Sequence, residues 1–217
     1  NIIICDMKQK KSDIPFIYIN TEKENSFNNL FKILKQKKIK IESVINCTYP
    51  MPKIFDKNPL NINKKQFTKY IDQHLWSFNL TIRVFVKYFQ KNKIKGHIIN
   101  LASIYGTSLP DFKIYNDFNL FTSFEYFFSK HNIVLFTKYY AKYLKKNMIR
   151  INAISPGGIN NNFNKKFVRK YSSKTITKKM LSSNDLNGLV EFLISKGANK
   201  ITGQNYTSDL LFVLPTN

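Results

Sequence analysis

The segment Tyr126-Phe127-Phe128-Ser129-Lys130 holds the pair of side chains on which the interpretation of this sequence depends. If the segment is helical, Tyr126 and Lys130 lie one turn apart on the same face. An ammonium group beside a phenol stabilises the phenolate and lowers the pKa of the tyrosine. A tyrosine tuned in this way can exchange a proton with a carbonyl or carbinol oxygen. The spacing alone is a weak signal, because the chain contains 12 tyrosines and many lysines.

Two flanking segments strengthen the signal. Upstream, the apolar run 98–102 reads as a strand that ends in Ser103, shortly before Gly106. Downstream, the apolar run 149–154 reads as a second strand that ends in the turn Pro156-Gly157-Gly158-Ile159. The three features occur in an order that a chance match to a Tyr-x-x-x-Lys spacing would not produce.

Short apolar runs alternate with segments of helical periodicity along the chain, which is typical of α/β proteins with a parallel sheet. Strands are predicted at 1–5, 16–19, 41–46, 98–103 and 149–154, and from residue 201. Helices are predicted from the N-cap Ser26, at 64–92, 124–146 and 184–195, the last capped by Ser183 or Asn184. The segment 64–92 has seven apolar residues on one helical face: Phe67, Ile71, Leu75, Phe78, Ile82, Phe85 and Phe89. Residues 107–122 read as irregular, and residues 160–170 as polar and mobile.

A doubly wound dinucleotide fold begins with a strand, a glycine-rich turn and a helix, and the turn holds the pyrophosphate. No such segment precedes the strand predicted at 1–5. The sequence therefore predicts one Rossmann-like, three-layer α/β/α domain over residues 1–217, lacking this first unit. We expect the chain to be a fragment of a longer protein; the alternative is a protein that has lost its phosphate cradle.

The net charge of +22 raises the possibility of nucleic-acid binding. Only three of the 35 basic residues are arginines, the residue type favoured for bidentate phosphate and base contacts. The lysines are scattered, and Asn, Ile, Phe and Tyr are also abundant, which is the bias of an AT-rich genome. We therefore expect a solvated basic surface without a specific nucleic-acid partner.

The compartment is inferred from what the sequence lacks. No apolar run reaches the roughly 18 residues that would indicate a membrane span. We find no secretory signal, and the two cysteines, Cys5 and Cys47, are too few for a disulfide framework. We expect a cytoplasmic protein with reduced thiols, no membrane partner and no metal site.

The ordered set of serine-bearing strand, Tyr-x-x-x-Lys pair and Pro-Gly-Gly turn resembles the short-chain dehydrogenase/reductase family, from Asn1 to about Asp209. The resemblance implies that Ser103 hydrogen-bonds the substrate oxygen and that Tyr126 is the general acid or base. It also implies that Lys130 lowers the pKa of Tyr126 and, with Tyr126, meets the cofactor at its nicotinamide ribose.

The same resemblance implies cofactor contacts at two strand ends. Asp6 stands where the family has an acidic residue for the adenosine ribose, which argues for NAD over NADP; a turn or capping Asp is the alternative. Asn46 matches the first residue of the family's Asn-Asn-Ala-Gly stretch, as a ligand contact or a buried structural Asn, whereas Tyr49 replaces the glycine.

Further contacts and departures lie near the nicotinamide. Pro156, Gly157, Gly158 and Ile159 match the turn that approaches the nicotinamide amide, but Asn160 to Asn162 stand where a phosphate-binding Thr is common. His74, not Asn79, falls at the position of the family's catalytic Asn. His74 could hold the same water by a ring nitrogen, or it could be a packed core histidine.

The interval between Ser103 and Tyr126 is longer than usual in the family and contains Pro110 to Tyr115. It resembles a branch described as flagellin-modification oxidoreductases, linked to sialic-acid-like sugars. The expected function is thus NAD(P)-dependent interconversion of a secondary alcohol and a ketone on a sugar or nucleotide sugar. The resemblance also implies a homodimer or homotetramer that pairs through its two long helices. The alternative is a non-catalytic member of the fold, supported by His74, the missing glycine turn and Leu210-Leu211.

Overall fold

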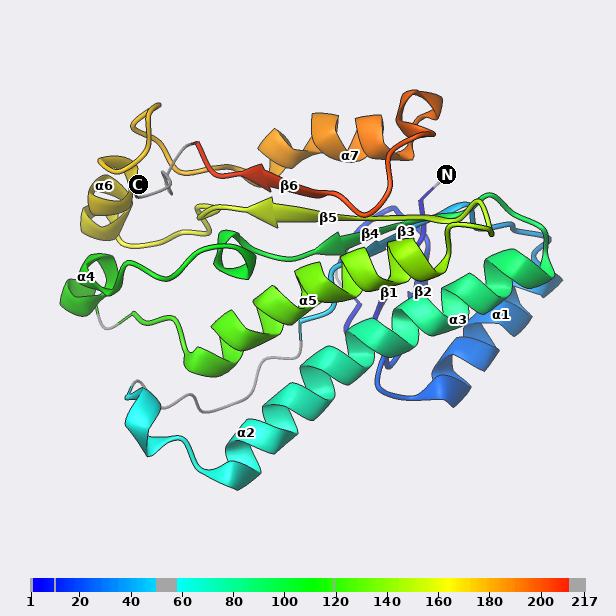
Figure 1. Cartoon of the computed structure of the whole chain (residues 1–217), viewed down its shortest axis with the longest axis horizontal. Coiled ribbons are helices and arrows are strands. Elements are labelled where there is room, and N and C mark those ends of the chain that lie inside the picture. The colour runs from blue at the N-terminus through cyan, green and yellow to red at the C-terminus, as the bar shows by residue number, and fades with distance from the viewer. Residues whose placement is uncertain (1, 10, 50–57, 119, 211–217) are drawn as a thin grey trace.

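The computed structural model describes residues 2–9, 11–49, 58–118 and 120–210 (Figure 1). Residue 1 of the first predicted strand and Leu211 lie outside these ranges. The described strands pair in parallel as two sheets. The first sheet contains β1 (Ile4–Asp6) and β2 (Phe16–Tyr18). The second has the order β3 (Ser43–Asn46), β4 (His97–Leu101), β5 (Arg150–Pro156) and β6 (Asn205–Ser208).

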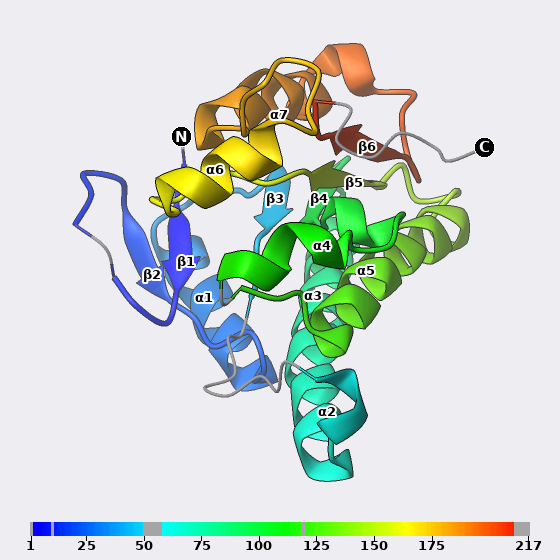
Figure 2. The ribbon, with the colours of Figure 1, turned by 90° about the vertical axis from the view of Figure 1, so that its left-hand side faces the viewer.

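Helices cover both faces of the sheet, so the predicted Rossmann-like α/β/α fold is confirmed (Figure 1). One face carries α1 (Glu24–Gln36), α2 (Lys64–Ile71), α3 (Ser77–Lys91) and α5 (Phe124–Tyr143). The other carries α7 (Asn187–Ile194). The short helices α4 (Phe112–Tyr115) and α6 (Lys165–Ser172) lie beyond the carboxyl ends of the strands (Figures 1 and 2). Within the described residues, no helix has both the length and the apolar character needed to cross a membrane.

The core is divided between the two faces by the alternation of side chains along β4 and β5. Ile98 and Ile151 face α1 and α3, in a cluster with Phe85 and other apolar residues. Ile99 and Ile154 face α7 in a second cluster. The helical face predicted for the segment 64–92 is confirmed in α3, where four of its residues are buried: Phe78, Ile82, Phe85 and Phe89.

The sheet is interrupted between β1 and β3, since no strand pairing among the described residues joins them. Figure 2 shows β2, β1 and β3 in succession from left to right. The classic doubly wound order is 3-2-1-4-5-6. With β1, β2 and β3 taken as the second, third and fourth strands, the interruption falls at the place of the first strand. Cys5 and Asp6 of β1 are exposed there.

A π-helical turn, Asp72–Trp76, separates α2 from α3 and was not predicted from the sequence. Such a turn inserts one extra residue per turn and rotates the side chains that follow. Leu75 was predicted to lie on the buried face, but it is only half-buried, whereas His74 is fully buried. The wider turn therefore directs His74 inward.

Four further predictions about local structure were wrong. Ser26 is not the N-cap of α1, because its Oγ accepts a hydrogen bond from the Asn20 amide instead. Residues 165–172 form a helix because Asn164 caps it and Phe167 and Tyr171 are buried together. Ser182, paired with Asp185, caps the turn that leads into α7. β6 starts at Asn205 because the Thr202 hydroxyl accepts the Ile151 amide hydrogen before the strand begins.

Candidate active site

Ser103 and Tyr126 meet beyond the carboxyl end of β4. Ser103 lies two residues after the end of the strand and is buried, and Tyr126 lies in the first turn of α5. The Ser123 hydroxyl caps this helix by accepting the Tyr126 amide hydrogen at 3.1 Å, which fixes the backbone of the tyrosine. The Ser103 hydroxyl lies close enough to Tyr126 to lower the pKa of the phenol. Two side chains singled out from the sequence are therefore neighbours in the structure.

Lys130 lies one helical turn after Tyr126 and is almost completely buried. Its Nζ donates a hydrogen bond to the Leu101 carbonyl oxygen at 3.1 Å and lies 5.7 Å from the centroid of the Tyr126 ring. Burial lowers the pKa of Lys130 to about 8. The ammonium group therefore loses its proton more readily than an exposed lysine.

The pKa of Tyr126 moves in the opposite direction from the sequence expectation. Burial raises it, and the hydrogen bond from Ser103 opposes this only in part. Removing the phenolate from water costs more than the neighbouring polar groups recover. In this arrangement the Tyr126 phenol keeps its proton at neutral pH.

Aromatic rings surround the Lys130 ammonium group. Nζ lies 5.5 Å from the Tyr49 ring centroid and 5.9 Å from that of Phe78, in addition to its contact with Tyr126. The Tyr49 ring packs edge-on against Tyr126, with centroids 5.7 Å apart. The residue that replaces the expected glycine thus covers Lys130 and Tyr126, a contact that the sequence did not reveal.

His74 lies beside this group. Its ring centroid is 5.4 Å from that of Tyr49, and its Nδ1 is 3.0 Å from the Tyr70 hydroxyl. Among the described residues, its buried Nε2 has no hydrogen-bond partner. Burial, followed by the charge of Lys130, lowers the pKa of His74 to about 3, so the ring is neutral. Asn79 points elsewhere, since its Oδ1 accepts the Tyr140 hydroxyl at 2.8 Å.

The turn from Pro156 to Ile159 closes tightly at the end of β5. The Gly157 amide donates to the Ser208 carbonyl at 2.8 Å, and a Cβ on Gly157 would lie 2.9 Å from the Asp209 Cα. A Cβ on Gly158 would lie 2.6 Å from the Tyr171 ring. A side chain at either position would meet Asp209 or Tyr171, so glycine allows the turn to close against these two residues.

Asp6 and Asn46 end β1 and β3, as predicted. The exposed Asp6 carboxylate accepts the Lys8 amide hydrogen at 3.2 Å, so it forms a turn and also presents oxygen to solvent. Asn46 is buried, donates to Asn100 Oδ1 at 3.4 Å and accepts from the Thr48 hydroxyl at 2.9 Å. These partners fit the structural alternative for Asn46.

The long interval before Tyr126 folds into α4 and a following turn, packed against α6. Ile114 from α4 and Phe167 and Tyr171 from α6 form one buried cluster. The Tyr105 and Tyr115 hydroxyls are hydrogen-bonded, and the Tyr105 ring centroid lies 6.5 Å from that of Tyr126. Tyrosine hydroxyls and rings therefore dominate the wall on this side of the site.

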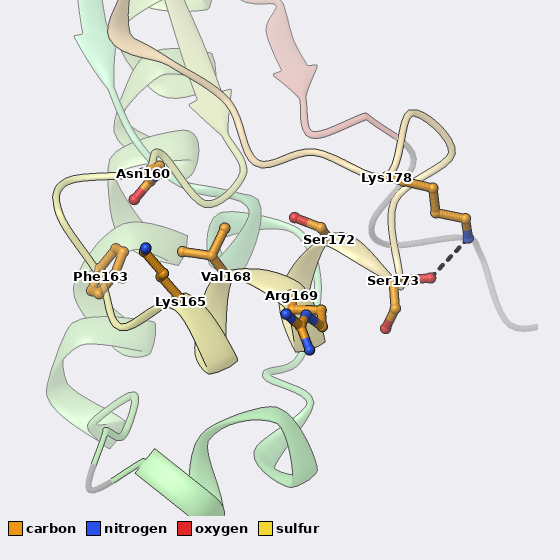
Figure 3. A pocket seen from close by; sticks show the side chains of 8 residues that line it. All are labelled: Asn160, Phe163, Lys165, Val168, Arg169, Ser172, Ser173 and Lys178. Carbon is orange, nitrogen blue, oxygen red and sulfur yellow. Dashed lines mark hydrogen bonds between the residues drawn. The ribbon is translucent and has the colours of Figure 1, made fainter.

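A cavity of about 490 Å³ runs along the outer side of α6 (Figure 3). Its lining begins at Asn160, directly after the turn, and includes Lys165, Arg169 and Lys178. None of Ser103, Tyr126 and Lys130 lines it. The cavity is a basic surface adjacent to the site, separate from the proposed reacting groups.

Sequence reasoning missed Tyr70, Tyr105 and Tyr171. The four-residue spacing of Phe167 and Tyr171 could have indicated a buried helical face within a polar segment. Tyr70 and Tyr105 carry no comparable local signal, because their roles depend on contacts with distant residues.

Comparison with known proteins agrees with this geometry. The sequence model of the family described as enoyl-(acyl carrier protein) reductase matches residues 5–210. The chain belongs to the short-chain dehydrogenase/reductase family and is an oxidoreductase. The resemblance predicted from its motifs is confirmed.

Three relatives illustrate the similarity. The post-translational flagellin modification protein A of Campylobacter coli is 31% identical over 200 residues, which cover 92% of this chain and 78% of the relative. A short-chain dehydrogenase of Leptospira borgpetersenii, solved with bound NAD+, has a TM-score of 0.85 and 30% identity, covering 98% of this chain and 82% of its own. A 4-hydroxyisoleucine dehydrogenase complexed with NADH has a TM-score of 0.76 and 27% identity, covering 95% and 85%.

Proposed function

We propose that this protein transfers a hydride between a nicotinamide cofactor and a secondary alcohol or ketone on a sugar or nucleotide sugar, in a bacterial cytoplasm. The observation that carries the proposal is the assembly of Ser103, Tyr126 and Lys130 at the junction of β4 and α5. Two hydroxyls and an ammonium group in one buried network are what proton transfer at a carbonyl oxygen requires.

The residues fit a nicotinamide dinucleotide at both of its ends. Near the nicotinamide, Gly157 and Gly158 let the turn from Pro156 to Ile159 close against Asp209 and Tyr171, which fixes the backbone that would meet the cofactor. Near the adenosine, the exposed Asp6 carboxylate can accept hydrogen bonds from ribose hydroxyls and would repel a 2′-phosphate, so we propose NAD over NADP. When bound, the nicotinamide supplies or accepts the hydride.

Tyr126 handles the proton in the proposed reaction. Because burial raises its pKa, the phenol is protonated and can donate to a carbonyl oxygen as that oxygen gains charge. Ser103, whose hydroxyl lies close enough to Tyr126 to lower the pKa of the phenol, offers a second hydroxyl to the same oxygen. Lys130 holds positive charge near the phenol below its own pKa of about 8, and this charge stabilises the phenolate that remains after the proton is donated.

We further propose that His74 replaces the asparagine usual in the family. Its unpartnered Nε2 lies in the buried group with Tyr49 and Lys130 and can bind a water molecule. The neutral ring can donate to or accept from that water, depending on the tautomer that Tyr70 selects. A water held there would connect Lys130 to solvent.

Two features support a polar, sugar-sized substrate. The insertion at 107–122 brings Tyr115 to Tyr105, whose ring packs against Tyr126, and these hydroxyls and ring faces can contact a sugar. The adjacent cavity contains Lys165, Arg169 and Lys178, which suit a phosphate or carboxylate. The similarity to flagellin modification protein A agrees with such a substrate.

We also propose a homo-oligomer paired through α5. Three large side chains on this helix, at four-residue spacing, are at least half exposed: Leu135, Tyr139 and Tyr143. An exposed apolar row on a long helix is typical of a helix–helix interface.

One observation favours the alternative, a non-catalytic member of the fold. The Tyr49 ring covers Lys130 and Tyr126 where the family has glycine. If Tyr49 stays in place, the nicotinamide ribose cannot reach Lys130.

Calorimetry of NADH binding to the protein expressed from its complete gene tests the proposal. We expect binding, and turnover with keto-sugar nucleotides. Tyr49→Gly separates the two candidates: binding only after this substitution would favour the non-catalytic protein, and no binding by either form would exclude the oxidoreductase proposal.

A further inference from the structure

Helix α6 presents two different faces. Its outer face contributes Lys165, Val168, Arg169 and Ser172 to the basic cavity, as Figure 3 shows. Its inner face carries Phe167 and Tyr171, both buried. The proposed function uses none of the inner side chains, yet Tyr171 makes a specific contact with the turn that follows β5.

The Tyr171 hydroxyl accepts a hydrogen bond from the Gly158 amide at 2.6 Å. The ring lies against the same residue, since a Cβ on Gly158 would come within 2.6 Å of the Tyr171 Cζ. Gly158 is therefore held both by a hydrogen bond and by ring contact. No side chain can be added at Gly158 without moving Tyr171.

Several contacts fix Tyr171 itself. Its ring centroid lies 6.0 Å from that of Phe167, which in turn lies 5.9 Å from that of Tyr115. Lys170, the preceding residue, donates to Asp117 Oδ2 at 2.5 Å and to the Lys113 carbonyl at 2.7 Å. These bonds join α6 to the insertion around α4. The helix that carries Tyr171 is therefore held against the segment that contains Tyr115.

We propose that Tyr171 is a positioning residue that sets the backbone of the turn Pro156 to Ile159 for the nicotinamide end of the cofactor. The inference rests on the proposed function. Tyr171 acts through Gly158: a turn that is held in one conformation loses less freedom when a ligand binds against it. Because α6 is also bonded to the insertion around α4, the position of the turn after β5 and the position of the insertion are fixed relative to each other.

Tyr171→Phe removes one hydroxyl and keeps the ring. Tyr88→Phe is the matched control, since the Tyr88 hydroxyl also accepts a backbone amide hydrogen, from Ile41 at 3.1 Å, in the core beneath the sheet. Calorimetry with NADH and with ADP-ribose, which lacks the nicotinamide, separates positioning from general structural damage. We expect Tyr171→Phe to weaken NADH binding roughly 5- to 10-fold and to leave ADP-ribose binding unchanged. Tyr88→Phe should change neither.

Equal weakening for both ligands, or no change for either, would overturn the proposal. Amide hydrogen exchange at Gly158, measured by NMR without ligand, provides a test that does not depend on cofactor binding. If wild-type protein binds no NADH, the proposed function fails, but faster exchange at Gly158 in Tyr171→Phe still supports the hold on the turn. Unchanged exchange would refute it.

Discussion

The four-stranded sheet and the two-stranded sheet of this protein differ in how deeply their strands are buried. In β4 and β5, Ile98, Ile99, Ile151 and Ile154 are completely buried, with helices on both faces. In β1, two of three residues are exposed, and the strand has one partner. The groups proposed for proton transfer lie beside the four-stranded sheet, and the residue proposed for the adenosine ribose ends a strand of the two-stranded sheet.

This difference follows from what each end of the site must do. Proton transfer needs side chains held within hydrogen-bonding distance of one another, which dense packing provides. A carboxylate that receives ribose hydroxyls needs exposure and a correctly directed strand end. The residues proposed for proton transfer therefore lie in a densely packed half of the molecule, whereas the residue proposed for the nucleotide lies in an exposed half.

Tyr126→Phe should have the largest effect. Removing the phenolic proton should lower turnover about 10²- to 10⁴-fold and leave NADH binding nearly unchanged. Steady-state rates with keto-sugar nucleotides and calorimetry with NADH check this. Tyr88→Phe makes the same chemical change away from the site, and equal turnover in the two variants would remove Tyr126 from its role.

Hydrogen exchange should separate the two sheets directly. We expect the amides of β4 and β5 to exchange on the order of a hundredfold more slowly than those of β1 and β2, because opening a doubly covered strand requires sub-global unfolding. Mass spectrometry or NMR on the ligand-free protein measures this. Similar protection in β1 and β5 would break the comparison.

Acid should destabilise the four-stranded half. Burial lowers the pKa of both His74 and His97 to about 3, from 6.5. The unfolded chain therefore takes up protons below pH 6.5 that the folded chain refuses, and stability falls as pH decreases from 6.5 towards 3. Each histidine should cost about 2 kcal/mol between pH 6.5 and roughly pH 5.

Urea unfolding at the two pH values checks the acid effect, with His97→Gln as the test variant. His97 belongs to β4, where Asn152 Nδ2 lies 3.1 Å from its Nε2. The variant should lose about 2 kcal/mol less than wild type on acidification. An unaltered loss would mean that His97 does not carry the pH dependence.

Asp6→Ala should have the smallest effect of the four. Loss of the carboxylate should weaken NAD binding about tenfold and reduce discrimination against NADP. Competitive binding of the two cofactors measures both quantities, and Asp13→Ala, at another exposed aspartate nearby, is the control. If cofactor preference does not change, Asp6 serves only the turn that it forms with Lys8.

The order of the elements and most of the candidate site could be predicted from sequence because both depend on patterns within short stretches of chain. The apolar period of α3 identified Phe78, Ile82, Phe85 and Phe89 as core. The spacing of Tyr126 and Lys130, the serine after β4 and the Pro-Gly-Gly turn after β5 identified the family. These signals need only neighbouring residues, since strand alternation and helical periodicity are properties of a short stretch of chain.

Tertiary structure alone decided the rest. The Tyr49 ring over Lys130 and the Tyr171 hydroxyl on Gly158 join different segments of the chain. His74, in the π-helical turn, likewise packs against Tyr49 from a distant segment. The pKa of Tyr126 rises, against the expectation from Lys130, because burial outweighs the opposing effect of the Ser103 hydroxyl. Desolvation and ring packing depend on which segments meet in space, and no local pattern in the chain records that information.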